Sequence, residues 1–217
     1  MRIKLPLTLL AYIFATLPSI ANEAAAPADG GNISITESVR YILDTDMEYN
    51  TTVFQADPST PQAQFGVSFE GDGQQSLTLD KKDTTEKTAQ FLFRPENTDP
   101  RIDTFTLSIS QLDNLHLGGT YGAVELSNNQ GDSVFSITDI GGNVSLDNNT
   151  IERSGNAADA LVSLHSSGNN TIFIDDIGGT LSISNNTKTS GATQSGLGLL
   201  IYSYNKTENS SNSLIQI

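Results

Sequence analysis

Residues 122–129 read GAVELSNN, residues 142–149 read GNVSLDNN and residues 179–186 read GTLSISNN. The three stretches share one pattern: a Gly, two apolar residues at alternate positions, and a closing pair of Asn. Period-two alternation puts the apolar side chains on one face of a β-strand and the polar ones on the other. The Gly permits the corner before the strand. The Asn pair suits the corner after it, because Asn tolerates left-handed backbone and hydrogen-bonds its own chain.

Weaker copies of the same pattern lie between and after these three. Residues 198–205 (GLLIYSYN) have Tyr204 in place of the first Asn, and residues 160–167 (ALVSLHSS) form a degenerate copy. The five copies begin at positions 122, 142, 160, 179 and 198, and a sixth, weak match begins at Asp103. A step this regular is typical of proteins that stack one small structural unit many times.

A unit of about 19 residues cannot bury its own apolar face, but stacked units can bury one another's. We therefore expect an all-β protein in which residues 103–217 form a parallel β-helix solenoid with turns of about 19 residues. The alternative is a β-sandwich in which the spacing is coincidental. The β-helix predicts two interior columns, with Ser145 and Ser182 outside them: one of Val124, Val144, Val162, Leu181 and Leu200, the other of Leu126, Leu146, Leu164, Ile183 and Tyr202.

A second pattern alternates with the first. Residues 135–142 (FSITDIGG) and 172–179 (IFIDDIGG) end in the same four residues. Their separation is twice the step between the repeat copies, so this larger unit corresponds to a pair of the expected turns. Stacked Asn side chains at the corners are expected to hydrogen-bond those above and below.

The first half of the chain divides by composition. Residues 1–21 have a basic start, an apolar stretch and a small residue at each of positions 19 and 21, which predicts a secretory signal peptide cut after Ala21. Residues 22–29 read as a flexible leader. Residues 30–102 alternate apolar and polar side chains between turn-forming segments, which predicts an N-terminal capping β region. Residues 38–49 are the one helix candidate, and their β-branched and Tyr residues argue against it.

The end of the chain matches the start of the larger unit. Ile215 and Ile217 align with Phe135 and Ile137, and the Asp-Ile-Gly-Gly corner should follow. A solenoid needs a polar cap on its last turn. We therefore expect that the sequence is truncated at the C-terminus and that more turns follow.

Composition excludes several function classes. The chain has 11 Lys and Arg against 25 Asp and Glu, a net charge of −14, and no Cys. Binding to a nucleic-acid backbone requires clustered basic residues, so we expect no nucleic-acid partner. The absence of Cys removes disulfides, thiolate metal sites and thiol nucleophiles. Beyond residues 1–21, no apolar run is long enough to span a membrane as a helix.

The repeats resemble the passenger region of autotransporters, and specifically the polymorphic outer membrane protein family. The family pairs a Gly-Gly-Ala-Ile-like motif with a Phe-x-x-Asn-like motif. In this chain Leu or Ile replaces the Phe, and Asn or Thr replaces the Ala. The resemblance covers about half of the chain and is carried by Gly122-Ala123-Val124, Gly141-Gly142-Asn143-Val144 with Leu146-Asp147-Asn148, and Gly178-Gly179-Thr180-Leu181 with Ile183-Ser184-Asn185.

The resemblance implies a right-handed β-helix displayed on the outer membrane of a Gram-negative bacterium and acting in adhesion. It implies that the partners are a host surface, matrix or glycan. The family also carries a C-terminal translocator barrel, which the sequence to Ile217 lacks.

Few residues are suited to catalysis. His116 and His165 are the only histidines, and a surface position explains both. Asp139 and Asp176 occupy equivalent repeat positions, with Asp175 next to the second. Two turns would put them about 10 Å apart, around the upper limit for an inverting acid/base pair. Capping of the turn before Ile-Gly-Gly is the favoured interpretation of these Asp residues, and no catalytic residue is assigned.

Two further segments are rich in charged side chains, and the first is a candidate metal site. Residues 44–50 (DTDMEYN) place oxygen-bearing side chains at alternate positions, as a calcium loop does, but lack the Gly and terminal Glu of an EF-hand loop. A solvated strand face explains them as well. Lys81, Lys82 and Lys87 lie among acidic residues and indicate a mixed-charge loop. No metal-ligating or cofactor-binding residue is assigned, and no cofactor is expected.

Three functions are compatible with these observations. The first is a non-enzymatic, secreted or surface-displayed β-helix for adhesion or surface interaction. The second is a secreted carbohydrate-active enzyme or carbohydrate-binding module on a β-helix. The third is a structural spacer.

Overall fold

A computed structural model describes residues 22–81, 88–94, 101–119, 121–128, 130–147, 149–152, 161–189, 201–205 and 213–216. These residues contain strands and no helix, so none of them forms a helix able to cross a membrane. The all-β prediction is confirmed. The expected signal peptide, residues 1–21, lies outside the described residues.

The described strands form three large parallel sheets and one small sheet. Sheet A contains β1 (Asn22–Ala25), β3 (Val39–Ile42), β6 (Gln62–Glu70), β9 (Ile102–Leu112), β12 (Asp132–Ile140), β16 (Asn170–Ile174) and β20 (Ser213–Gln216). Sheet B contains β2 (Asn32–Ile35), β5 (Val53–Ala56), β8 (Phe91–Phe93), β11 (Val124–Asn128), β15 (Val162–Ser166) and β19 (Ile201–Asn205). Sheet C contains β4 (Met47–Tyr49), β7 (Leu77–Lys81), β10 (Leu115–Gly119), β13 (Val144–Ser145) and β17 (Leu181–Ser182). Strands β14 (Thr150–Glu152) and β18 (Thr187–Thr189) pair with each other.

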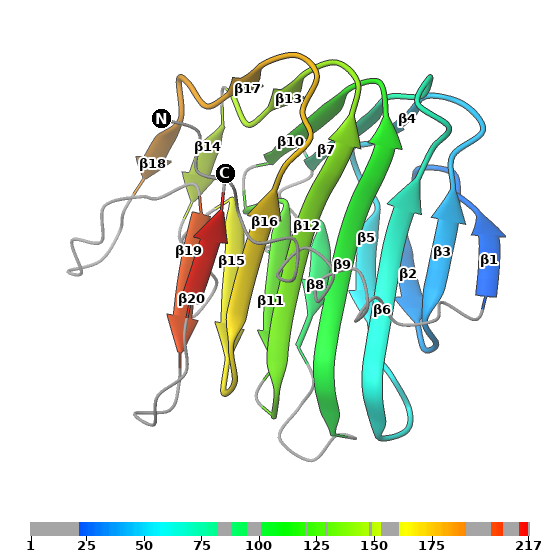
Figure 1. Ribbon diagram of the computed structural model, residues 1–217, viewed down its shortest axis with the longest axis vertical. Coiled ribbons are helices and arrows are strands. Elements are labelled where there is room, and N and C mark those ends of the chain that lie inside the picture. Colours follow the sequence, from blue (N-terminus) through cyan, green and yellow to red (C-terminus); the bar gives the residue numbers. More distant parts are fainter. Residues whose placement is uncertain are drawn as a thin grey trace.

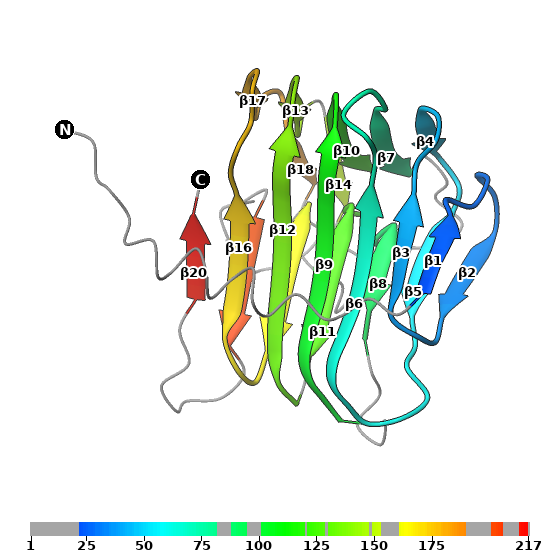
Figure 2. The ribbon, with the colours of Figure 1, turned by 45° about the vertical axis from the view of Figure 1, so that its right-hand side comes forward.

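From β3 onward the chain visits sheets A, C and B in a fixed order, once per turn. Figure 1 shows sheet A in front, sheet B behind it and sheet C across the top. Figure 2, turned by 45°, shows the same three sides around one interior. Because each strand pairs in parallel with the strand one turn away, the fold is a parallel coil of the β-helix type.

The predicted turn of about 19 residues is not confirmed. Val124 pairs with Val162, and Val144 pairs with Leu181, so strand partners lie two steps of the repeat apart instead of one. The five copies from residue 122 onward therefore lie alternately on sheets B and C, and the larger unit corresponds to one turn instead of two. The weak sixth match at Asp103 lies in β9 of sheet A and is not a copy of the same unit. Two sides of the coil use the same local sequence, because each requires a corner, a short strand and another corner.

The predicted interior columns are accordingly wrong in their membership. Val124 and Val162 belong to one column, while Val144 and Leu181 belong to another. Register also places Tyr202 opposite Ser163 instead of Leu164, so Tyr202 does not join the expected column. Leu200 lies outside the described residues.

The predicted burial is confirmed in the interior of the coil, but it is wrong at the edge of sheet C. Val144 and Leu146 are buried, but Leu181 is half-buried and Ile183 is 43% exposed. Strand β17 is the edge strand of sheet C among the described residues, so no described strand covers this side of Ile183. Ser145 and Ser182, expected to be exposed, are half-buried.

The N-terminal strands continue the same three sheets. Residues 22–25, within the expected flexible leader, form β1, which pairs with β3. The helix candidate at 38–49 contains β3 and β4 instead. The expected boundary at residues 102 and 103 falls at the start of β9, which pairs with β6 before it and β12 after it.

Candidate functional site

The corner between sheets A and C holds Asp139 and Asp176, the two residues considered above as a catalytic pair. Gln111, Asp139 and Asp176 all have left-handed backbone, with φ of 55–56°. Pairing of β12 with β9, and of Ile140 with Ile177, aligns these three residues in successive turns. Asp139 and Asp176 are therefore one strand spacing apart, about 4.8 Å, and not two. Asp tolerates this backbone conformation better than most residues, which accounts for its place at the corner.

A Gly pair follows the Asp139 and Asp176 corners, and close stacking requires three of these four glycines. A Cβ on Gly178 would lie 2.3 Å from the Gly141 carbonyl oxygen, and one on Gly179 would lie 2.5 Å from the Gly142 carbonyl oxygen. A Cβ on Gly142 would lie 2.5 Å from Asn114 Oδ1. These glycines are not at positive φ. Their role is to let one corner lie directly on the next.

Asparagine side chains join successive turns at the following corner, as expected. Asn114 Oδ1 accepts a 2.8 Å hydrogen bond from the Asn143 N–H, and Asn143 Oδ1 accepts one of 2.9 Å from the Thr180 N–H. In the Asn pairs, Asn149 Nδ2 donates to Asn186 Oδ1 at 2.9 Å. These hydrogen bonds between Asn side chains and the neighbouring turn confirm the expectation. They satisfy backbone N–H groups and side-chain polar groups that would otherwise hydrogen-bond to water.

The outer face of sheet C carries a connected row of polar side chains. Register aligns Thr78, His116, Ser145 and Ser182 in neighbouring strands. Ser145 Oγ lies 3.3 Å from His116 Nδ1 and donates a 3.0 Å hydrogen bond to Asp147 Oδ2. We call Asp80, His116, Ser145, Asp147 and Asn149 the sheet C cluster.

Asp147 anchors one end of the sheet C cluster. It accepts hydrogen bonds from the backbone N–H and the hydroxyl of Ser184, the latter at 2.9 Å. Hydrogen bonds from the Ser182 hydroxyl, and then from Ser184 and Ser145, hold the pKa of Asp147 below its usual value. An ionised, bonded carboxylate is a fixed hydrogen-bond acceptor on this face.

The other end of the sheet C cluster surrounds Gly118. Asp80 is the register partner of Gly118, and His116 precedes it by two residues on the same strand face. Asn149 is buried, and its Oδ1 accepts a 3.1 Å hydrogen bond from the Gly119 N–H. Gly118 has no side chain, and these polar groups border the place that its Cβ would take, which we call the Gly118 notch.

The cluster is not a catalytic triad. In a Ser-His-Asp triad the imidazole lies between the hydroxyl and the carboxylate. Here Ser145 lies between His116 and Asp147, so the carboxylate that bonds the serine cannot orient the imidazole.

The remaining candidate residues are dispersed. His165 is half-buried on β15 of sheet B, so the two histidines lie on different sides of the coil. In residues 44–50, Asp46 Oδ1 accepts from the Ser76 N–H at 2.8 Å, and Asn50 Nδ2 donates to Glu48 Oε1 at 3.0 Å. The part of the chain that the structure describes contains no group of three or more His, Cys, Asp or Glu able to hold a metal.

The interpretation of Lys81 as part of a mixed-charge loop is wrong. Lys81 is only 2% exposed, and its Nζ donates to the Thr88 carbonyl oxygen and hydroxyl, both at 3.2 Å. It is the last residue of β7, where the strand alternation turns its side chain inward. Lys82 and Lys87 lie outside the described residues.

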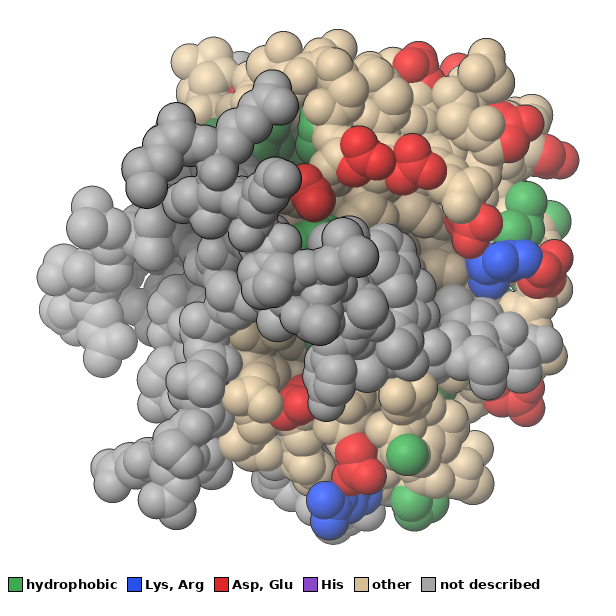
Figure 3. Space-filling model, viewed as in Figure 1, with side chains coloured by type: hydrophobic (Ala, Val, Ile, Leu, Met, Phe, Trp, Pro, Cys, Tyr) green, Lys and Arg blue, Asp and Glu red, His purple; other side chains and the backbone are tan. Residues whose placement is uncertain are grey.

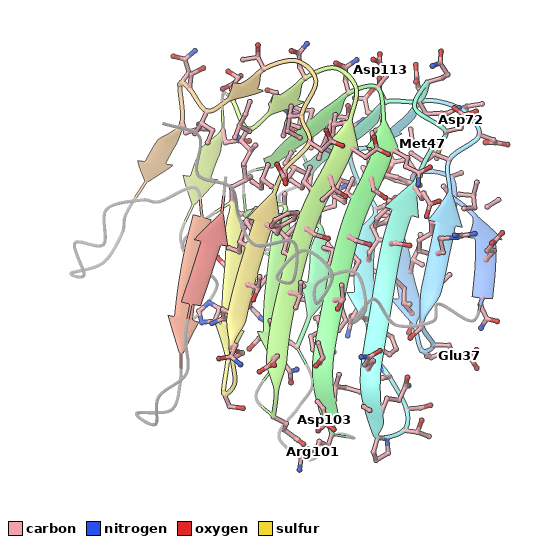
Figure 4. The ribbon with its side chains drawn as sticks, in the orientation of Figure 1. Glu37, Met47, Asp72, Arg101, Asp103 and Asp113 are labelled. Atoms are coloured by element: carbon pink, nitrogen blue, oxygen red, sulfur yellow. The ribbon has the colours of Figure 1, made fainter. Side chains whose placement is uncertain are left out.

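Acidic side chains are spread over the face seen in Figure 3, and basic ones are sparse there. Figure 4 shows Asp72 and Asp113 along the corner of the coil where β6 and β9 finish, and Arg101 and Asp103 at the start of β9. Arg101 and Asp103 form an ion pair at 2.5 Å. The described surface therefore suits neutral or cationic partners better than anionic ones.

Sequence reasoning missed the sheet C cluster. His116 and Ser145 are 29 residues apart, and this interval matches neither the step between repeat copies nor the larger unit. The alternation around each residue did indicate that both point outward, which is the one signal that was present.

No protein-family model matches this sequence, and no curated protein or solved structure matches the chain.

Proposed function

We propose that this chain is a non-enzymatic β-helix that is exported to the bacterial surface or beyond and binds uncharged glycans through the outer face of sheet C. The coil is right-handed, as connections between parallel strands nearly always are. The resemblance of its repeats to autotransporter passengers supports export through the outer membrane of a Gram-negative bacterium and a role in adhesion.

The observation that carries the proposal is the hydrogen-bonded row from His116 through Ser145 to Asp147 and Ser184. These short side chains are held by one another across three neighbouring turns. Ordered donors and acceptors lose little conformational freedom when they bind a ligand. Glycan hydroxyls bond well to carboxylates and hydroxyls of this kind, and an acidic surface disfavours sulfated or sialylated glycans.

The test compares two matched variants on different sides of the coil. Thr78 is half-buried on the outer face of sheet C, and Ser108 is half-buried on the outer face of sheet A. Thr78→Arg and Ser108→Arg each add one bulky positive side chain. The protein and both variants are applied to an array of neutral and anionic glycans and to epithelial cells.

We expect binding to neutral glycans that falls at least tenfold in Thr78→Arg and is kept in Ser108→Arg. An equal loss of glycan binding in both variants would show that the outer face of sheet C is not the binding face. Absence of binding to every glycan and cell type would reject adhesion and favour the spacer.

A second candidate function, a carbohydrate-active enzyme, is favoured by one observation. The backbones of Asp139 and Asp176 are one strand spacing apart, which allows the carboxylate separation of about 5 Å found in retaining glycosidases. Asp139→Asn and Asp176→Asn keep a residue that tolerates left-handed backbone and remove the carboxylate. Release of reducing ends from polysaccharides by the parent, abolished in both variants, would establish this function in place of the first.

A further inference from the structure

Three ligand atoms converge over Gly118 in the sheet C cluster. A Cβ on residue 118 would lie 2.9 Å from His116 Nε2, 3.0 Å from Asn149 Oδ1 and 3.0 Å from Asp80 Oδ1. The three atoms come from three different parts of the coil: β10 itself, β7 one turn before, and the segment that follows β13 one turn after. Glycine at 118 thus leaves one small volume with a nitrogen and two oxygens around it.

The other hydrogen bonds of His116 and Asn149 determine whether each side chain directs a lone pair or a hydrogen toward that volume. Ser145 Oγ uses its one hydrogen on Asp147, so it accepts a hydrogen bond from His116 Nδ1. With Nδ1 protonated, the neutral imidazole has its lone pair on Nε2, the atom at the notch.

The orientation of the Asn149 amide is fixed in the same way. Its Nδ2 donates to Asn186 Oδ1 at 2.9 Å, and its Oδ1 accepts from the Gly119 N–H at 3.1 Å. The carbonyl end is therefore the end at the notch. A carboxylate oxygen of Asp80 completes a set of three atoms that carry lone pairs and no hydrogen.

We propose that the Gly118 notch binds a divalent first-row transition-metal ion through His116 Nε2, Asp80 Oδ1 and Asn149 Oδ1. Imidazole nitrogen favours Zn²⁺ or Ni²⁺ over Ca²⁺ and Mg²⁺, which prefer oxygen ligands alone. The Ser145 hydroxyl orients the imidazole, as outer hydrogen-bond partners of metal-ligating histidines do. Asp80 and His116 are half-buried, so the solvent side of the ion stays open for water or for an oxygen of another molecule.

This site does not depend on glycan binding by sheet C, and its test uses the metal alone. The full chain is titrated calorimetrically with ZnCl₂, NiCl₂ and CaCl₂ in about 0.15 M NaCl, which screens diffuse attraction to the acidic surface. The chain has two histidines, so the imidazole resonances of His116 and His165 are assigned by comparison with His165→Gln.

Three variants change the site and two leave it intact. His116→Gln and Asp80→Asn each replace a ligand at nearly constant volume, and Gly118→Ala fills the notch while leaving all three ligand residues unchanged. His165→Gln and Gly141→Ala are the matched controls. A Cβ on Gly141 would have its nearest neighbour, the Leu112 carbonyl oxygen, at 3.8 Å. Circular dichroism establishes that each variant is folded.

We expect one Zn²⁺ or Ni²⁺ per chain, a shift of the His116 Nε2 resonance on Zn²⁺ binding, and weaker binding of Ca²⁺. Affinity should fall at least tenfold in His116→Gln, Asp80→Asn and Gly118→Ala and stay unchanged in both controls. Absence of saturable binding, or binding that persists in folded His116→Gln or Gly118→Ala, would overturn the site.

Discussion

The corner between sheets B and A is filled in two different ways along the coil. In the N-terminal turns it contains aromatic rings. Phe93 and Phe105 stack with ring centroids 3.8 Å apart and an interplanar angle of 12°, and Phe65 stacks on Phe105 at 5.7 Å. All three rings are fully buried. Here the corner is stabilised by apolar burial and ring contacts.

In the C-terminal turns the same corner is polar. Pairing places Ser133 next to Phe105 and Asn170 next to Ser133, and both are buried. Asn128, also buried, donates through Nδ2 to the carbonyl oxygens of Asp132 at 2.8 Å and Ile102 at 3.1 Å. Here the Asn128 side chain stabilises the corner, because it bonds the backbone of its own turn and of the neighbouring turn.

This difference explains why only the C-terminal half shows a repeat. The position of Asn128 is occupied by Ser166 one turn later and by Asn205 two turns later, so a small polar residue recurs there. Rings of different size and tilt, in contrast, fill an apolar corner equally well. In sheet A, Val39 pairs with Val67 and Val67 pairs with Leu107, so the second of these turns is much longer than the first. The N-terminal turns thus vary in length and leave no period in the sequence.

The largest expected effect is the loss of a ring from the aromatic corner. Phe105→Ala should lower the free energy of unfolding by about 4 kcal/mol, because it removes a buried ring and leaves a cavity. Phe135→Ala is the matched control, since Phe135 is also buried in sheet A but has no ring contact among the described residues. Urea unfolding should show Phe105→Ala to be the more damaging by about 1 kcal/mol, the contribution of ring pairing. Equal losses of stability in the two variants would show that ring pairing does not stabilise the aromatic corner beyond ordinary apolar burial.

The second effect tests the stacked corners of the C-terminal turns. Gly178→Ala should cost about 3 kcal/mol, because its Cβ would lie 2.3 Å from the backbone oxygen of Gly141 and the turns must move apart. Gly141→Ala, with its nearest neighbour at 3.8 Å, should change stability little. Hydrogen exchange should show weakened protection around β16 and β17 in Gly178→Ala alone. A neutral Gly178→Ala would mean that conformational freedom, and not stacking, selects the Gly pair.

The sequence predicted the strands and their inward faces but not the length of a turn. Period-two alternation around Val124 and Val144 was sufficient to place both in the interior. It could not show that they lie on different sides of the coil, because the corner chemistry of 122–129 and 142–149 is the same. Whether each copy of the repeat forms one side of the coil or one whole turn is decided by which strands pair between turns. A single sequence does not contain that information.

The third effect concerns the polar corner. Asn128→Ala should cost about 2 kcal/mol, because the carbonyl oxygens of Ile102 and Asp132 lose a buried donor. Asn128→Asp keeps the acceptor for the Gln130 N–H and removes the donor, so it should cost at least as much. Urea unfolding of both variants checks this. If Asn128→Asp were as stable as the parent, the hydrogen bonds to the two carbonyl oxygens would not be what stabilises this corner.

The candidate site was less predictable than the fold. Asp139 and Asp176 were visible because they share a motif, and the structure then brought them closer than expected. His116, Asp80 and Asn149 share no motif and are brought together by pairing between strands that lie far apart in the sequence. Gly118, which leaves room for them, looks in the sequence like any other glycine near a turn.

The smallest effect is a pH dependence that compares the carboxylates bridging turns in the two halves. In the C-terminal half, hydrogen bonds from Ser182, Ser184 and Ser145 lower the pKa of Asp147 in the folded chain. In the N-terminal half, burial acts to raise the pKa of Asp29, but hydrogen bonds from Thr52 and Thr51 outweigh it and the net shift is also downward.

A carboxyl whose folded pKa lies below its unfolded value stabilises the fold above the unfolded pKa, and this stabilisation is lost as pH falls through the folded pKa. Asp147→Asn and Asp29→Asn should therefore each be slightly less stable than the parent at pH 7. The difference should begin to shrink near the unfolded pKa of about 4 and go on shrinking as pH falls toward the lower folded pKa. Urea midpoints measured from pH 7 down to pH 3 check this, with exposed Asp103→Asn as the control. A deficit that stays constant or grows with acidification in the two variants would show that the amide geometry, and not the carboxylate charge, connects these turns.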